Sequence, residues 1–350
     1  MDGCVVGGSA NRQRARGVQM TEFTVGLVGA GGISSAHAAA WQAIEGARLQ
    51  VHALEGAEAF RETYGVPVVD TYEALLETSD LICVITPTPE HAHLVERALR
   101  AGKDVVCEKP LTRTTADGRR LVALADELGR RVFPAHVVRW FPQYAAAHTT
   151  VAAGGLGDLA VLRFTRAVPY PFDRGWYSDP VQSGGITMDL MIHDLDQAAW
   201  LAGPVATVYA QRRTGSDPHP TETAHVVLTH TSGAISHCRG LWTVPGAPFW
   251  YTFQISGTTG TLRYDSREEV GYRLTRVPED TSNRPVGVTS FTADPYAAEI
   301  ADFVRAWRTG EPAGVSTDDG LVAVALAEAA QLSAETGEPV DFQAFVKGTL

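Results

Sequence analysis

The sequence has few cysteines, and none of them forms a pair with the spacing of a redox or metal site. Cys4, Cys83, Cys107 and Cys238 are scattered over 350 residues without a C-x-x-C pair. Cys83 and Cys107 lie in apolar, strand-like runs, where a thiol is usually buried and unpaired. This pattern argues against a disulfide framework and favours free thiols in a reducing compartment, so we expect a cytoplasmic protein.

Long hydrophobic runs and an excess of positive charge are also absent from the sequence. No apolar run approaches the roughly 18 residues that suggest a membrane-spanning helix. Lys and Arg number 29 against 40 Asp and Glu, which gives a formal net charge of −11 at pH 7. Because nucleic-acid binding requires a basic surface that displaces counterions, we expect neither a membrane nor a nucleic acid as a partner.

The chain is long enough for two domains. At 350 residues, with 45% hydrophobic and 20% charged residues, it exceeds what one ordinary core holds. Residues 1–21 are rich in Gly and Arg and lack apolar periodicity, which predicts a disordered tail ahead of the fold. An upstream extension of a protein that begins at Met20 is the alternative interpretation of this tail.

Residues 22–144 predict a doubly wound α/β domain. Nearly continuous apolar strands alternate with helices that often end on glycine, which is typical of a parallel sheet covered on both faces. The strands are expected at 24–28, 49–54, 81–86, 104–108 and 131–135. Residues 145–350 change to long alternating strands joined by short turns, which predicts a second α/β domain with a large, mainly antiparallel sheet and helices on one face.

The segment "GAGGIS" at 29–34 follows the first expected strand and opens a helix, which is the context in which such a motif binds a dinucleotide. Gly29 forms the tight turn, and Gly31 lets the backbone approach a pyrophosphate at the helix N-terminus. Gly32 and Ile33 complete this loop, and Ser34 takes the place of the third glycine. A glycine turn without a ligand is the alternative.

Glu55 is the candidate ligand for the adenosine ribose. It follows the second expected strand, about 20 residues beyond the glycine loop, and no Lys or Arg accompanies it in "ALEGAEA". An acid at this place accepts hydrogen bonds from the ribose hydroxyls. The expected cofactor is therefore NAD, with NADP left open.

Two further segments follow strands of the same expected sheet. "TPTPEH" at 86–91 is stiffened by its prolines and carries hydroxyls, and its candidate cofactor contacts are Thr86, Pro87, Thr88 and His91. "DVVCEKPL" at 104–111 places Glu108 and Lys109 where a buried strand ends. Since the carboxyl ends of parallel strands share one edge of the sheet, these loops outline a pocket there. A solvated turn lysine is the alternative for Lys109.

"GGITMDLMIHDLDQAAWLAG" at 184–203 carries the remaining polar candidates. Asp189 and His193 are spaced so that one helix would place both on the same face. A lone histidine in such a helix usually has only a structural role. The pair becomes a candidate for acid–base chemistry because the chain already has a dinucleotide loop.

Other chemistries have little support in the sequence. Several of the 11 histidines could be combined into a metal site, but no H-E-x-x-H or C-x-x-C spacing occurs, so no metal is expected. A serine-hydrolase interpretation fails because the chain contains no G-x-S-x-G elbow.

In their order and at their distances, the glycine loop, "TPTPEH", "AGKDVVCEKPL" and "GGITMDLMIHDLD" resemble the Gfo/Idh/MocA oxidoreductases, the family of glucose–fructose oxidoreductase and inositol dehydrogenase. The likeness covers roughly residues 22–345. It implies a Rossmann domain at 22–144 and a substrate-binding α/β domain at 145–350. It also implies an NAD(P) cofactor and an open sheet that often serves oligomerisation. We expect this sheet to present Trp242, Trp250 and Tyr251 on its exposed face, and hence a homodimer or homotetramer.

The same resemblance assigns roles to individual residues. Lys109, Asp189 and His193 match the catalytic positions, and residues 86–91 and Glu108 match cofactor contacts. "AHVVRWFPQY" at 135–144 is similar to the family segment beside the nicotinamide. The implied substrate contacts, besides the catalytic residues, are His136, Arg139, Trp176 and Tyr177. Tyr177 departs from the pattern, since many relatives have Arg after the Trp.

The expected function is hydride transfer between a nicotinamide cofactor and a secondary alcohol or ketone of a sugar, polyol or sugar derivative. Three alternatives stay open: an aldose or ketose reductase, an NAD-dependent glycosidase of the same fold, and a non-catalytic NAD(P)-sensing protein. The complete set of Lys109, Asp189 and His193 argues against the sensor, because a sensor needs no acid–base group.

Overall fold

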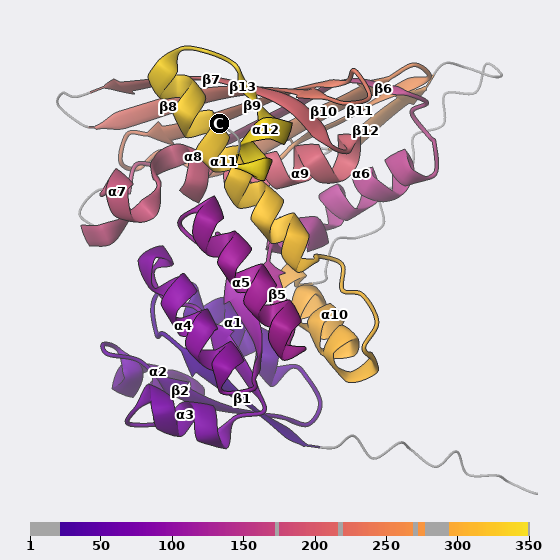
Figure 1. The fold of residues 1–350 in the computed structure, drawn as a ribbon. Helices are drawn as coiled ribbons and strands as arrows, with labels where there is room; N and C mark the ends of the chain where they lie inside the picture. Colours follow the sequence, from indigo (N-terminus) through magenta and orange to yellow (C-terminus); the bar gives the residue numbers. More distant parts are fainter. Residues whose placement is uncertain (1–21, 172–174, 216–219, 269–271, 277–293, 349–350) are drawn as a thin grey trace, which may run out of the picture.

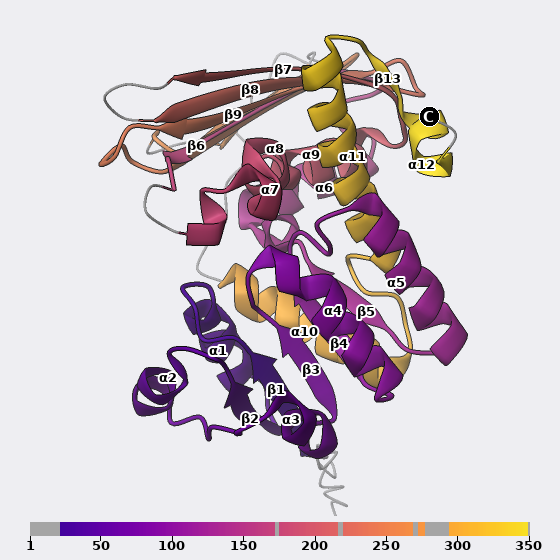
Figure 2. The same ribbon diagram turned by 60° about the vertical axis from the view of Figure 1, so that its left-hand side comes forward.

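The computed structural model describes residues 22–171, 175–215, 220–268, 272–276 and 294–348. The tail predicted at 1–21 lies outside this part of the chain. Figures 1 and 2 show a parallel-sheet domain and a second domain with a broad sheet, with helices of the second domain between the two sheets. Among the described helices, none is both long and apolar enough to cross a membrane.

The first domain has the parallel sheet that the sequence predicts, which confirms this part of the fold. Over the described residues its sheet has five strands in the order β2-β1-β3-β4-β5. The strands are β1 (Phe23–Val28), β2 (Ala47–His52), β3 (Leu81–Val84), β4 (Asp104–Glu108) and β5 (Val132–Ala135). The helices are α1 (Ser34–Gln42), α2 (Ala57–Tyr64), α3 (Tyr72–Thr78), α4 (Thr88–Arg100) and α5 (Thr115–Leu128).

The strand order of this sheet creates a switch point between β1 and β3. From β1 the chain turns to β2 on one side, and it later enters β3 on the other side. Ligands of open parallel sheets bind in the crevice at the carboxyl ends of strands at such a point. The glycine loop after β1 and the "TPTPEH" loop after β3 therefore both lie at the expected binding edge.

The second domain contains the mainly antiparallel sheet that the sequence predicts. Over the described residues it has eight strands in the order β12-β11-β10-β6-β9-β8-β7-β13, and only the β6–β9 pair is parallel. These strands are β6 (Leu159–Pro169), β7 (Val205–Gly215), β8 (Thr221–His230), β9 (Ile235–Thr243), β10 (Trp250–Gly257), β11 (Gly260–Asp265), β12 (Tyr272–Arg276) and β13 (Val340–Asp341). The edge strands β12 and β13 were not predicted.

The helices α6, α8, α9 and α11 lie between the large sheet and the first domain (Figures 1 and 2). They are α6 (Pro142–Ala152), α8 (Gly185–Asp189), α9 (Ile192–Ala202) and α11 (Thr317–Thr336), and the short α7 (Pro180–Ser183) precedes α8. The helix α12 (Phe342–Lys347) ends the described chain. One face of the sheet is thus covered, and the core of the domain lies between this face and the helices.

The direction of three aromatic side chains on this sheet corrects one expectation. Trp242, Trp250 and Tyr251 were expected on the open face, where they would favour oligomerisation. Trp242 and Tyr251 are instead only 3% and 8% exposed and point toward the helices. Neighbouring residues of a strand point to opposite faces, so only Trp250 can lie on the open face, where Arg267 stacks 4.1 Å from its ring.

The helix α10 (Pro295–Thr309) connects the end of the chain to the first domain. Its Phe303 packs against Phe133 of β5, with ring centroids 5.4 Å apart. Figures 1 and 2 both place α10 beside the parallel sheet. A segment more than 260 residues beyond the glycine loop thereby completes the core of the first domain.

Candidate functional site

The glycine loop after β1 has the geometry that a bound pyrophosphate requires. Gly29 has a φ of 112°, and a Cβ there would lie 2.7 Å from the carbonyl oxygen of Ile85, so the turn accepts only glycine. A Cβ at Gly31 or Gly32 would instead meet open space. No side chain caps the start of α1 at Ile33, although the N–H groups of Ser34 and Ala36 already donate to the carbonyl oxygens of Gly31 and Ile33. The helix N-terminus that faces this loop favours an anion.

The loop after β3 faces the same edge and carries an unused donor. The Thr86 hydroxyl is buried, and within the described part of the chain it has no hydrogen-bond partner. An orphaned buried hydroxyl beside an open glycine loop is what a missing polar ligand leaves behind. The residues at this edge therefore fit a dinucleotide, although contacts of Thr86, Pro87 and Thr88 with it stay predictions.

The turn after β2 contacts the glycine loop. Gly56 has a φ of 78°, and a Cβ there would lie 3.3 Å from the carbonyl oxygen of Ala30. The preceding Glu55 is exposed, and Leu54 beside it is 95% exposed. Glu55 thus lies at the ribose end of the expected groove, and its bond to the ribose stays a prediction. The sequence did not single out Leu54, since an apolar strand end carries no signal of its exposure.

His91 connects the two loops rather than lying open to a ligand. Its Nδ1 lies 2.8 Å from the carbonyl oxygen of Pro110, and its Nε2 lies 2.9 Å from that of Thr86. The side chain is 1% exposed, and burial lowers its pKa. The imidazole holds the turn after β4 against the loop after β3, so its expected contact with the cofactor stays a prediction.

Lys109 reaches across the domain boundary to Asp189. Its ammonium lies 2.7 Å from the carbonyl oxygen of Asp189 and 3.3 Å from the carboxylate Oδ1. The Tyr177 hydroxyl donates to the other carboxylate oxygen, Oδ2. The lysine side chain is 18% exposed, and the peptide bond that joins it to Pro110 is cis. Three of the sequence-predicted residues thus lie together, which argues against the interpretation of Lys109 as a solvated turn lysine.

Asp189 and His193 lie on two helices, not on one helix face as the spacing predicted. α8 ends at Asp189 and α9 begins at Ile192. The break arises because the Met191 N–H donates to the carbonyl oxygen of Ile186, five residues back, instead of continuing the regular ladder. The extra residue in this turn separates Asp189 from the face on which His193 lies.

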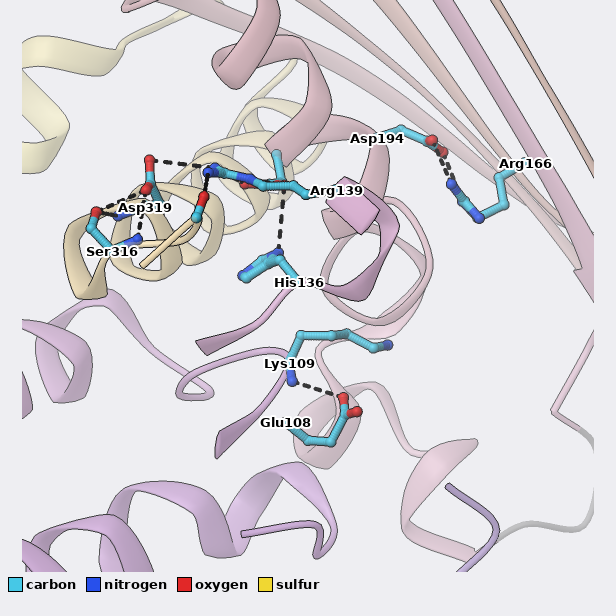
Figure 3. A network of polar contacts seen from close by, with 10 residues as sticks. Glu108, Lys109, His136, Arg139, Arg166, Asp194, Ser316 and Asp319 are labelled. Carbon is cyan, nitrogen blue, oxygen red and sulfur yellow. Dashed lines mark hydrogen bonds and ion pairs between the residues drawn. The ribbon is translucent and has the colours of Figure 1, made fainter. Parts of the chain in front are cut away.

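His193 is an uncharged histidine near Lys109, and it is a candidate general base. Burial lowers its pKa well below the ordinary value of 6.5, and the positive charges of Lys109 and Arg166 lower it further. Arg166 is itself buried and bonded to Asp194 of α9, which fixes that helix on the sheet (Figure 3). At neutral pH the His193 imidazole is therefore uncharged and able to accept a proton.

His136 and Arg139 follow β5, and both lie beside Asp196. His136 is 1% exposed, and its Nδ1 lies 3.8 Å from Oδ2 of Asp196 (Figure 3). Neither ring nitrogen of His136 has a hydrogen-bond partner among the described residues. Arg139 bonds both oxygens of Asp196, at 2.9 and 2.6 Å, and lies 3.3 Å from Asp319 (Figure 3). Because Asp196 and Asp319 already pair with the Arg139 guanidinium, the expected contact of Arg139 with the substrate stays a prediction.

An aromatic wall extends from Tyr177 along the second domain. The ring centroids of Tyr177 and Trp242 are 6.4 Å apart, and Tyr170 lies 5.3 Å from Trp242. Trp176 packs edge-on against Tyr177 at 5.3 Å. Trp242 and Tyr170 were not among the expected site residues, because only the parity of β9 directs Trp242 inward. Among the described residues, the Trp242 Nε1 has no hydrogen-bond partner.

Metal chemistry has no candidate site in the described ranges, where no group of His, Cys, Asp and Glu residues has the arrangement to hold an ion. The described cysteines Cys83, Cys107 and Cys238 are free and buried, as expected for the first two.

Known proteins match both domains. Residues 23–136 match the model of an oxidoreductase family with an NAD-binding Rossmann fold, and residues 144–263 match the GFO/IDH/MocA C-terminal domain. Inositol 2-dehydrogenase of Rhizobium meliloti (strain 1021) is 31% identical over 330 residues, which cover 87% of this chain and 94% of the relative. D-apiose dehydrogenase of Paraburkholderia graminis is 28% identical, over 92% of this chain and 90% of the relative.

A solved structure with a similar fold carries the cofactor. GenD2 from gentamicin A biosynthesis, in complex with NAD, superposes with a TM-score of 0.80 at 25% identity, covering 97% of this chain and 99% of that one. Together with the matched NAD-binding family, it confirms the expected cofactor.

Proposed function

Because the chain belongs to the Gfo/Idh/MocA oxidoreductase family, we propose that it oxidises a secondary alcohol of a cyclic polyol or sugar with NAD. The family assignment makes it an NAD(P)-dependent enzyme acting on CH–OH groups, and the relatives named for inositol and apiose support this class of substrate. The observation that carries the proposal is the contact between Lys109 and Asp189, which joins the two domains beside the neutral His193.

The first domain would hold the dinucleotide along the edge of its sheet. The backbone of Gly31 and Gly32 leaves room for the pyrophosphate, and the Glu55 carboxylate would accept hydrogen bonds from the ribose hydroxyls. Thr86 offers its orphaned hydroxyl from the neighbouring loop. NAD supplies the hydride acceptor when it is bound.

Lys109 and His193 divide the proton chemistry of the reaction. Oxidation of a carbinol releases its hydroxyl proton, and the uncharged His193 is the group able to accept it. The Lys109 ammonium donates a hydrogen bond to the oxygen on which negative charge develops. Asp189 keeps the ammonium in place through its carbonyl and carboxylate oxygens.

The aromatic wall supports a ring-shaped substrate. Tyr177, Trp242 and Tyr170 present a continuous set of rings that begins at the residue bonded to Asp189. Such surfaces bury the apolar face of a ring while its hydroxyls seek polar partners. The unpartnered Trp242 Nε1 offers one such donor.

A panel assay tests this proposal. The purified protein is given myo-inositol, D-apiose, D-xylose and related polyols with NAD⁺ or NADP⁺, and the absorbance of the reduced nicotinamide is followed. We expect turnover of at least one ring substrate with NAD⁺, lowered by about 10²-fold or more in the Lys109→Met variant. Absence of turnover over the whole panel, with ketoses and NADH included, would overturn the proposal. NAD-dependent release of nitrophenol from glycosides would identify the glycosidase alternative.

A further inference from the structure

Glu108, the residue before the catalytic lysine, has both carboxylate oxygens engaged. Its Oε1 lies 2.8 Å from Nε2 of His37. Its Oε2 accepts the backbone N–H of Lys109 at 2.9 Å, a bond that Figure 3 shows. His37 belongs to α1, so this carboxylate ties the nucleotide-binding helix to the turn that carries Lys109. The sequence predicted Glu108 as a cofactor contact, and His37 was not considered there.

His37 is enclosed on every side. It is 0% exposed, and its second ring nitrogen, Nδ1, lies 3.7 Å from the Cys83 sulfur of β3. Tyr296 of α10 packs edge-on against its ring, with centroids 5.8 Å apart. Glu299, one turn further along α10, is also 0% exposed, and among the described residues neither of its carboxyl oxygens has a hydrogen-bond partner.

The buried side chains of His37, Glu108 and Glu299 differ in their charge. Burial lowers the pKa of His37, but Cys83 and Glu108 raise it well above the ordinary value. Burial raises the pKa of Glu108, but His37 and Lys109 hold it below the ordinary value. Burial and the nearby Glu108 raise the pKa of Glu299 well above its ordinary value, so this carboxyl is neutral. A charged pair of His37 and Glu108 therefore lies beside a neutral Glu299.

We propose that His37 is a positioning residue for Lys109, and that it acts by holding the Glu108 carboxylate away from the lysine ammonium. Glu108 is the immediate neighbour of Lys109 in sequence and competes with Asp189 for its charge. The imidazolium satisfies the Glu108 charge from the opposite side, which leaves the ammonium to Asp189. The expected effect on kcat rests on the proposed function. The expected effect on the position of the Lys109 ammonium does not depend on a substrate.

The consequence of losing His37 follows from the titratable groups that face Lys109. These are Asp189 of α8, His193 of α9, His91 of α4 and Glu108 itself. Burial lowers the pKa of both histidines, so the negative charges come from the two carboxylates alone. Without the imidazolium, the Glu108 carboxylate is the second unbalanced negative charge within reach of the ammonium. It would draw the ammonium from Asp189, and the lysine would no longer point at the substrate oxygen.

Three variants separate this role from simple packing. His37→Phe keeps a ring under Tyr296 but removes both the hydrogen bond and the charge, and we expect kcat to fall about 10²-fold, the cost of a misplacement near 1 Å. Affinity for NAD should not change. His37→Gln keeps an N–H donor to Glu108 and should recover part of the loss. Adding Glu108→Gln to His37→Phe removes the competing charge and should raise kcat above that of His37→Phe alone.

A substrate-free measurement reports on Lys109 directly. Lys103, Lys109 and Lys347 are the lysines of the chain, so lysine labelled with ¹³C at Cε gives few and separable NMR signals. If the ammonium moves from Asp189 toward Glu108, the surroundings of the Lys109 side chain change even without substrate. The chemical shift of the Lys109 signal should therefore differ between His37→Gln and the wild type, while those of Lys103 and Lys347 stay in place.

His230→Phe is the matched control. His230 is also a buried histidine, bonded to the Gly203 carbonyl and the Ser236 hydroxyl in the second domain. Its replacement should lower the melting temperature without moving kcat or the Lys109 signal. The proposal is overturned if His37→Phe retains wild-type kcat, if Glu108→Gln brings no recovery, or if the Lys109 chemical shift is the same in His37→Gln and the wild type. Should the wild type turn over no ring substrate, the proposed function fails, and the Lys109 chemical shift still decides on His37.

Discussion

At the scale of single residues, the contact between Lys109 and Asp189 links the residue that follows β4 to the last residue of α8. Lys109 takes its position from β4 and from the His91 bridge, and Asp189 takes its position from the end of α8. The two residues come from different domains, so their geometry depends on how the domains pack.

Lys109→Met and His193→Ala should each lower kcat by about 10²–10⁴-fold, because positioned proton transfer contributes that much. NAD affinity should stay nearly unchanged, since we expect the glycine loop to hold most of the dinucleotide. Turnover and NAD binding are measured on the same samples. Lys103→Met is the control, because its ammonium bonds the Ser79 carbonyl at the opposite end of β4. Near-normal turnover of Lys109→Met would mean that this lysine is a surface residue after all.

The pH dependence of oxidation should follow the uncharged state of His193. Protonation of this imidazole removes the proton acceptor, and burial with Lys109 and Arg166 lowers its pKa well below 6.5. A lowered pKa keeps the base active as the pH falls, so the acidic limb of kcat/KM should have its midpoint below 6.5. A profile of initial rates over pH checks this. A midpoint clearly above 6.5 would assign the limb to another group.

At the scale of elements, the turn between β1 and α1 needs glycine for two reasons: the fold requires Gly29, and cofactor binding requires Gly31. Gly29→Ala places a Cβ 2.7 Å from the Ile85 carbonyl oxygen at a φ of 112°, so it should lower the melting temperature. Gly31→Ala meets no atom of the protein and should leave the melting temperature unchanged while weakening NAD binding. Thermal unfolding and NAD titration of both variants check this pair. Equal losses of stability would contradict it.

The turn between β2 and α2 should decide between NAD and NADP. Glu55 is exposed next to Gly56, which contacts the glycine loop, so its carboxylate would repel a 2′-phosphate. Glu55→Ser should therefore narrow the preference for NAD over NADP. The ratio of kcat/KM for the two cofactors measures the effect, with the equally exposed Glu58→Ser on α2 as the control. A wild type that already prefers NADP would refute the assignment.

At the scale of the whole molecule, the open face of the large sheet favours association. The described helices of the second domain lie on its other face, and the open face carries exposed or half-buried apolar residues such as Ile235 and Leu241. We expect a homodimer or homotetramer that buries this face. Light scattering at micromolar concentration checks the mass, and Ile235→Lys should weaken association. A monomer of 37.5 kDa for the wild type would contradict the expectation.

The parts of the fold that were predicted are those written in local patterns. The nearly unbroken apolar run of β4 predicts a parallel sheet, because such a strand is buried on both faces. The alternating pattern of β8 predicts an antiparallel sheet, because only one face of that strand is buried. Gly29 was predicted correctly because a tight turn after a strand has a steric need that only glycine meets. The two-residue β13 was missed, since so short a strand has no period at all.

Sequence by itself determined the two sheets, the glycine loop and the candidates Lys109, Asp189 and His193, because period, turn chemistry and motif spacing are local properties. Tertiary structure alone decided that α8 and α9 break between Asp189 and His193, that Arg139 pairs with Asp196, and that His37 bonds Glu108. The last two contacts join residues 57 and 71 positions apart. A buried charge is stable only when an opposite charge or a hydrogen-bond partner lies beside it, and the packing of the whole chain determines which group that is.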